Sequence, residues 1–165
     1  MSTHIEGKIE KIQQTIEKLK ETSTSTTAII VEGKKDEQAL REIGITATIL
    51  TIKTGGKNFL KAITEIQKLN PQETIFLLDF DRRGKEATKR LQKELEHLKI
   101  KTNLQFWREL KALLGHEMQC IESLPKYLIT LSKKMKNNQN QQPLVKRKRV
   151  LGNSFYPTAN SKMLQ

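Results

Sequence analysis

The first pattern along the chain is an apolar stripe near its start. Isoleucine and leucine recur at alternating spacings of four and three over residues 5–19, with glutamate and lysine between them. This period predicts an amphipathic helix with one apolar face. The face would pack either on the rest of the chain or on a second copy of itself, which makes a homodimer through this helix one expectation. The threonine-rich residues that follow, up to 27, are typical of a linker.

After residue 27 the pattern changes to short apolar runs that alternate with helical periodicity. Continuous apolar runs of this length predict buried strands, here at 28–31, 48–52, 74–78 and 100–104. Helical spacing predicts helices at 36–43, 57–69, 84–98, 106–114 and 124–135. The alternation predicts an α/β fold with a roughly four-stranded parallel sheet, flanked by helices and joined by right-handed crossovers.

Length and composition fit one domain of ordinary size. The chain has 165 residues, of which 36% are hydrophobic and 29% charged, with a net charge of +12, and this length suffices to bury a core. No apolar run approaches the roughly 20 residues of a membrane-spanning helix, and the first residues lack the pattern of a signal peptide. We therefore expect a cytoplasmic protein with no membrane association. The single cysteine, Cys120, excludes a cysteine-based zinc cluster.

The positive charge is concentrated toward the end of the chain. Residues 126–165 contain nine basic and no acidic residues, whereas residues 1–125 contain 21 basic and 18 acidic ones. We expect an N-terminal helix and linker at 1–27, the α/β domain with its C-terminal helices at 28–135, and a disordered basic tail at 136–165. The tail carries a cluster that favours polyanions, formed by Lys146, Arg147, Lys148 and Arg149.

Three carboxylates directly follow predicted strands. Glu32 follows the first strand, and Asp79 and Asp81 follow the third. Functional groups of open parallel sheets gather beyond the carboxyl ends of the strands, so these side chains converge if the two strands are neighbours. Clustered carboxylates repel one another unless a proton or a cation intervenes, and oxygen ligands suit Mg²⁺ or Mn²⁺. Helix capping is the alternative for both aspartates, and Asp36 is either a cap or an outer partner of a metal site.

Basic residues and glycines surround these acids. The cations that could neutralise phosphates are Lys34, Lys35, Arg82, Arg83 and Lys85. Lys57 follows a Gly-Gly turn that could bind phosphate through backbone amides. Gly33 and Gly84 are expected to permit close backbone approach or a positive φ, each just before a helix N-terminus that favours anions.

Two motifs made of these residues resemble the TOPRIM domain. They are Glu32-Gly33-x-x-Asp36 after one strand and Asp79-x-Asp81-x-x-Gly84 after another. The domain is shared by topoisomerases, bacterial-type primases, OLD-family nucleases and small ribosomal-RNA maturation ribonucleases. The resemblance covers 28–114 and is closest to small, stand-alone archaeal TOPRIM proteins. It implies the Rossmann-like TOPRIM fold, Mg²⁺ held by the two aspartates, and Glu32 as general acid or base or as an additional metal ligand.

The resemblance implies a Mg²⁺-dependent protein that processes RNA or DNA phosphodiesters, and a nuclease is the leading interpretation. A topoisomerase would need a separate domain with a nucleophilic tyrosine, and a primase would need further domains, including a zinc-binding one. Haloacid-dehalogenase-type phosphatases and receiver domains share acids at strand ends, but they place them differently along the chain. A metal-stabilised module that binds nucleic acid or docks on a larger complex without catalysis is the alternative.

Overall fold

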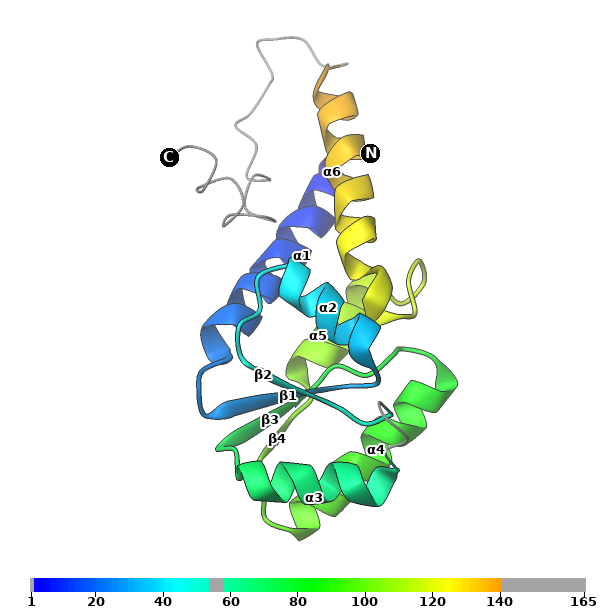
Figure 1. The fold of residues 1–165 in the computed structure, drawn as a ribbon. Coiled ribbons are helices and arrows are strands. Elements are labelled where there is room, and N and C mark those ends of the chain that lie inside the picture. Colours follow the sequence, from blue (N-terminus) through cyan, green and yellow to red (C-terminus); the bar gives the residue numbers. More distant parts are fainter. Residues whose placement is uncertain (1, 54–57, 141–165) are drawn as a thin grey trace.

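Four parallel strands form the centre of the structure, a computed structural model that describes residues 2–53 and 58–140 (Figure 1). They are β1 (Thr27–Val31), β2 (Thr48–Thr51), β3 (Glu73–Phe76) and β4 (Thr102–Asn103). Their order in the sheet is β2-β1-β3-β4, and every neighbouring pair is parallel. The predicted α/β class with a four-stranded parallel sheet is confirmed.

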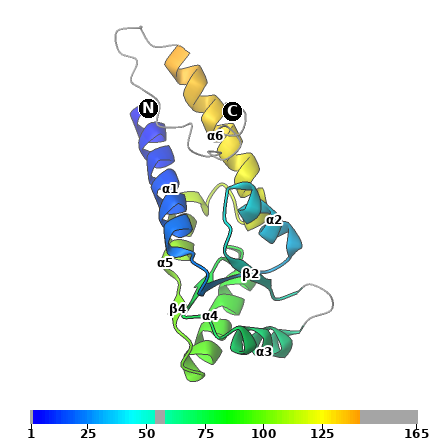
Figure 2. The ribbon, with the colours of Figure 1, turned by 60° about the vertical axis from the view of Figure 1, so that its left-hand side comes forward.

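Helices cover both faces of this sheet. They are α1 (Ser2–Thr22), α2 (Lys34–Glu42), α3 (Phe59–Leu69), α4 (Arg82–His97), α5 (Gln105–Leu114) and α6 (Leu124–Asn140), and the short 3₁₀ helix η2 (Ile121–Ser123) precedes α6. Figures 1 and 2 show α3 and α4 on one face and α1, α2 and α5 on the other, while α6 extends away from the sheet beside α1. Within the described ranges, none of the helices is long and apolar enough to span a membrane.

Strand β1 lies in the interior of the sheet, between β2 and β3. Its hydrogen bonds also align the segments that follow these strands. All five of its residues are buried, as expected for a parallel strand covered on both faces. Beyond the ladder, the Leu77 N–H donates to the Ile30 carbonyl at 2.9 Å, and the Lys53 N–H donates to the Glu32 carbonyl at 3.0 Å. The segments that follow β1, β2 and β3 therefore leave the sheet side by side, at the carboxyl ends of the strands.

Three of the observed strands are shorter than the predicted ones, and β2 ends at Thr51 rather than at residue 52. β3 ends at Phe76 rather than at residue 78. The carbonyl of Leu78 accepts a hydrogen bond of 2.8 Å from Trp107 Nε1 of α5 instead of one from a strand. The edge strand β4 has only two residues, where the apolar run predicted five.

Helix α6 extends beyond its expected end at residue 135. It continues to Asn140, so residues 136–140 are helical and the expected tail does not begin at 136. The buried face formed by Leu128, Leu131 and Met135 anchors the helix, and the polar residues after it extend the established turns. The rest of the predicted tail lies outside the described residues.

The apolar stripe of α1 packs within the chain. Ile9, Ile12, Ile16 and Leu19 are at most 3% exposed, and α1 contacts α5 and α6. The stripe is therefore covered by the chain's own helices, and a homodimer through α1 would need a different face of this helix.

We expect Ile12→Ala to lower the free energy of unfolding by about 2 to 4 kcal/mol, because it leaves a cavity in the core. Ile12 is fully buried. The matched control is Ile129→Ala on α6, where the side chain is 43% exposed and the expected loss is below about 1 kcal/mol. Urea denaturation measures both changes, and equal losses would contradict the packing of α1 on the domain.

Candidate functional site

Four carboxylates meet beyond the carboxyl ends of β1 and β3. They belong to Glu32, Asp36, Asp79 and Asp81, and the charges of the other three each act on Asp79. The adjacency of β1 and β3 produces this meeting, because residues that follow neighbouring parallel strands leave the sheet at the same edge. The structure thus brings together the acidic residues of both sequence motifs.

Asp36 lies at the start of α2 and is only 6% exposed. Its Oδ2 accepts from the Gly33 N–H at 3.0 Å, and its Oδ1 accepts from the Glu122 N–H at 3.1 Å. Burial raises the pKa of Asp36, and the Glu32 and Glu122 charges add to this, while the two backbone hydrogen bonds act in the opposite direction. Because both oxygens bind backbone amides, Asp36 fits an outer partner of the site better than a direct metal ligand.

Asp79 is the carboxylate most affected by its surroundings. Burial, together with the charges of Asp36, Glu32 and Asp81, raises its pKa to about 6, against the lowering effect of one backbone hydrogen bond. That bond is donated by the Ile121 N–H to Asp79 Oδ1 at 3.1 Å. At neutral pH the deprotonated form is therefore held at an energetic cost, which a nearby cation would reduce.

Asp81 caps the first turn of α4. Its Oδ1 accepts from the Gly84 N–H at 2.7 Å, which satisfies one of the free amides at the helix start. Phe80, between the two aspartates, is buried and contacts the Trp107 ring with centroids 6.1 Å apart. The capping interpretation is therefore correct for Asp81. Because the cap uses only one of the two carboxylate oxygens, it is compatible with a metal-binding role for the other.

Glu32 follows β1 and has a buried oxygen without a partner. Its side chain is 14% exposed, and Oε2 accepts from Lys53 Nζ at 3.0 Å. Oε1 is buried, and no hydrogen-bond partner reaches it in the described part of the chain. An unsatisfied buried carboxylate oxygen is costly. A cation or a proton donor at this point would satisfy it.

These observations fit a divalent metal ion held mainly by Asp79 and Asp81. Among residues 2–53 and 58–140, no three acidic, histidine or cysteine side chains lie close enough together to enclose an ion by themselves. Mg²⁺ commonly uses one or two carboxylates and fills its remaining positions with water and substrate phosphates. The donor set fits that mode, with Glu32 Oε1 as an additional oxygen nearby.

The two glycines of the motifs have different structural roles. A Cβ atom on Gly84 would lie 1.9 Å from the Asp79 carbonyl oxygen, so only glycine lets α4 begin this close to the Asp79 backbone. Gly33 has an extended φ of −146°, and a Cβ atom there would meet nothing within 4 Å. The expectation of close approach or positive φ is therefore correct for Gly84 and wrong for Gly33, whose contribution is its N–H bond to Asp36.

Exposed cations lie on both sides of the carboxylates. Those at the start of α2 and of α4 are Lys34, Lys35, Arg82, Arg83 and Lys85. Arg82 Nε contacts Glu86 at 3.1 Å, but both side chains are highly exposed, and such pairs contribute little. The predicted phosphate-binding residues Lys57, Lys146, Arg147, Lys148 and Arg149 lie outside the described residues.

The segment 119–122, which no sequence motif indicated, closes one side of the site. Besides its amide donors to Asp36 and Asp79, its Gln119 carbonyl accepts from the Phe80 N–H at 2.7 Å. Cys120 lies there too, and burial together with the negative charges of Asp79, Glu122, Asp81 and Asp36 raises the pKa of its thiol. Backbone donors have no residue signature, so the sequence carried no signal for them.

Comparison with known proteins agrees with the geometry. The family model of the Toprim domain matches residues 27–111. A UPF0292 protein of Methanocaldococcus jannaschii is 34% identical over 120 residues, which cover 72% of this chain and 91% of the relative. A UPF0292 protein of Thermococcus sibiricus is 32% identical over 114 residues, covering 69% and 85%. Both are small archaeal proteins, as the sequence resemblance implied.

A solved structure of a protein from Aquifex aeolicus shares the fold. It superposes with a TM-score of 0.56 at 24% identity, over 67% of this chain and 94% of that one. At this identity the likeness supports the architecture of sheet and helices alone.

We expect Gly84→Ala to lower the free energy of unfolding by at least about 2 kcal/mol, because its methyl group would overlap backbone that cannot move aside. Gly33→Ala is the matched control, since its Cβ atom meets nothing, and its expected change is within about 0.5 kcal/mol. Urea denaturation measures both. Equal losses would contradict the close contact between α4 and Asp79.

We expect the free energy of unfolding of Asp79→Asn to rise relative to that of the wild type as the pH rises. The pKa of Asp79 is raised from 3.8 to about 6, so the native state binds the proton more tightly than the unfolded state does. The free energy of unfolding of the wild type therefore falls between those two pH values. Asparagine has no proton to lose and keeps an acceptor for the Ile121 N–H.

The expected gain of Asp79→Asn relative to the wild type, from about pH 4 to pH 7, is on the order of 2 kcal/mol. Denaturation in EDTA, without divalent ions, measures it. A difference between the two proteins that does not change with pH would contradict the raised pKa.

Proposed function

This chain belongs to the Toprim domain family, and we propose that it is a Mg²⁺-dependent nuclease. The family is one of metal-dependent nucleic-acid processing. The observation that carries the proposal is the strained carboxylate cluster. Asp79 is half-buried beside three other acids, and Glu32 presents a buried oxygen without a partner in the described part of the chain.

The metal ion would be held by Asp79 and Asp81, and Mn²⁺ could substitute for Mg²⁺. When bound, the ion would polarise a phosphoryl oxygen and lower the pKa of an attacking water. Asp79 and Asp81 are held in place by the Ile121 N–H and the Gly84 N–H. Each of these hydrogen bonds uses one carboxylate oxygen and fixes the side chain to the backbone. The other oxygen of each aspartate therefore needs little reorganisation to serve as a metal ligand.

Glu32 is the proposed general acid or base. Lys53 holds Oε2 at 3.0 Å and fixes the orientation of the carboxylate, so that Oε1 is directed into the buried part of the site. An oxygen in that position can accept a proton from a water molecule or serve as an additional metal ligand. Lys53 acts through Glu32 and is therefore a positioning residue.

The exposed cations at the starts of α2 and α4 are proposed to position the phosphate backbone of RNA or DNA. They contact phosphates rather than bases in this proposal, so binding would depend on charge and not on sequence. The N-termini of the two helices carry partial positive charge and point toward the same region, which favours an anion there.

We expect wild-type protein to cleave RNA or DNA in Mg²⁺ or Mn²⁺ and not in EDTA. Asp79→Asn, Asp81→Asn and Glu32→Gln should each lower the rate by about 100-fold or more, because each removes a metal ligand or the proton-transfer group. Asparagine is as good a helix cap as aspartate, so Asp81→Asn separates the metal role from the cap. Product formation on labelled single-stranded and double-stranded substrates measures the rates.

The matched control is Glu37→Gln, which removes one negative charge from α2 at a residue that contacts Arg41 at 3.7 Å and lies outside the carboxylate cluster. It should retain the wild-type rate. Cleavage by Asp79→Asn at the wild-type rate, or cleavage that persists in EDTA, would contradict the proposal.

A non-catalytic module that binds nucleic acid or docks on a larger complex is the second candidate. It is favoured by the observation that no three potential ligands in the described ranges enclose an ion by themselves. Calorimetric titration of Mg²⁺ into the wild type and Asp81→Asn measures metal binding, and the cleavage assay measures product. The two measurements together separate the candidates. Metal-dependent binding without product under any divalent ion would favour the module.

A further inference from the structure

A row of lysines runs along α4 away from the carboxylate site. Lys85, Lys89 and Lys93 are spaced four residues apart, so they lie on one side of the helix. All three are exposed. The row begins within one turn of Asp81, because the Lys85 N–H donates to the Asp81 carbonyl at 3.0 Å.

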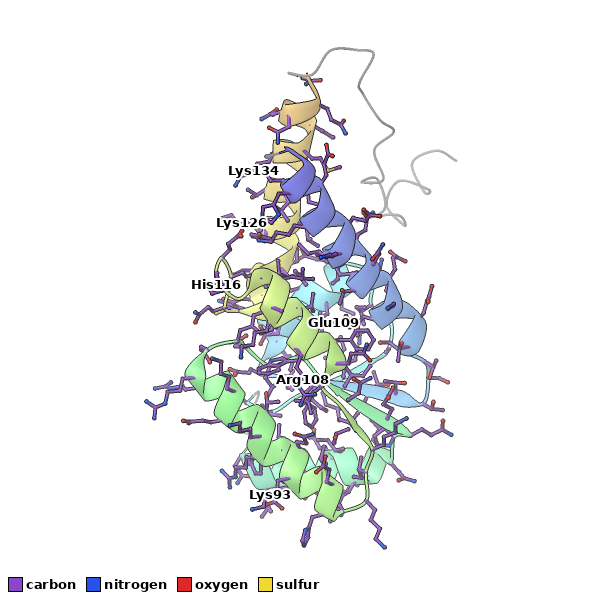
Figure 3. The ribbon with its side chains drawn as sticks, turned by 180° about the vertical axis from the view of Figure 1, so that it is seen from behind. Lys93, Arg108, Glu109, His116, Lys126 and Lys134 are labelled. Atoms are coloured by element: carbon purple, nitrogen blue, oxygen red, sulfur yellow. The ribbon has the colours of Figure 1, made fainter. Side chains whose placement is uncertain are left out.

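One cation of α5, Lys111, lies beside the start of this row. Lys111 lies close enough to Lys85 and Lys89 that its partial burial and their charges lower its pKa. Figure 3 labels Lys93 on α4 and Arg108 on α5. We call the surface formed by Lys85, Lys89 and Lys111 the lysine seam.

The lysine seam has a fixed position relative to the carboxylates. Lys111 Nζ lies 5.1 Å from the centroid of the Trp107 ring. Trp107 in turn donates to the carbonyl of Leu78, the residue before Asp79, and contacts Phe80, the residue after it. The same aromatic side chain therefore supports a cation of the seam and the backbone of the acidic motif.

The charges of the seam are not neutralised within the described structure. The ion pairs of residues 2–53 and 58–140 involve other cations, among them Lys8, Lys53 and Arg82, and none joins a carboxylate to Lys85, Lys89 or Lys111. Like charges four residues apart on a helix destabilise it. Such crowding is relieved when a polyanion binds.

We propose that the lysine seam binds the phosphate backbone of a nucleic-acid strand that extends from the carboxylate site along α4. The two α4 lysines of the seam lie about 6 Å apart along the helix axis, which matches about two nucleotides at the rise of one strand. The proposal rests on the proposed function for the identity of the polyanion. It does not require that the strand be cut.

The test compares two triple variants that remove the same charge. Lys85→Gln/Lys89→Gln/Lys111→Gln removes the seam. Lys18→Gln/Lys68→Gln/Lys133→Gln changes three exposed lysines on α1, α3 and α6. Fluorescence anisotropy with labelled single-stranded DNA and RNA, in EDTA and from about 50 to 200 mM salt, measures binding without cleavage. Circular dichroism establishes that both variants are folded.

We expect the seam variant to lose at least about tenfold in affinity at low salt, and the slope of log affinity against log salt to fall by about 2, since each phosphate contact on a single strand contributes about 0.7. The control variant should keep the wild-type slope. Equal effects of the two variants would show that only net charge matters and would overturn the proposal. Binding of poly-glutamate at the seam without binding of either oligonucleotide would assign the surface to an acidic protein and overturn it as well.

The binding and cleavage results are independent of each other. Seam-dependent binding by a wild-type protein that produces no cleavage would reject the nuclease and retain the seam. Cleavage with wild-type binding by the seam variant would retain the nuclease and reject the seam.

Discussion

Repulsion among carboxylates at the edge of a parallel sheet is the constraint on which the rest of the site depends. Asp36 is buried and Asp79 is half-buried, and both have raised pKa values because burial and neighbouring charges oppose ionisation. Such a cluster persists only where backbone donors hold it, since a native fold has little stability to spare. Here the donors are the amides of Gly33, Ile121 and Glu122.

These donors explain why the segment between α5 and α6 belongs to the site. The start of η2 binds Asp36 of α2 and Asp79 after β3, so one short stretch of backbone joins the two acidic motifs. The same stretch leads into α6, which packs on α1. Helices α1 and α6 lie outside the family match at residues 27–111. They extend the core, and they also hold in place the segment that binds Asp36 and Asp79.

The sequence was sufficient to predict the sheet, the helix order and the meeting of the acids, because apolar period and strand-end position are local signals. The pairing of Lys53 with Glu32 could also have been predicted, because Lys53 follows β2 and Glu32 follows the adjacent β1. This pairing becomes clear only when the strand order is known. The amides of Ile121 and Glu122 could not be predicted, because any residue supplies an N–H. The different roles of Gly33 and Gly84 likewise depend on packing distances that a motif does not encode.

Trp107 links the two charged surfaces of the molecule. Its indole N–H fixes the backbone just before Asp79, its ring contacts Phe80, and the ammonium group of Lys111 lies near its ring. A buried aromatic residue can keep opposite charges at a fixed separation, where flexible side chains would otherwise collapse into an ion pair. The acids and the lysines remain apart because the core between them is apolar. Separation of the charges by packing would therefore permit what we propose, that one small domain presents both surfaces to a single substrate.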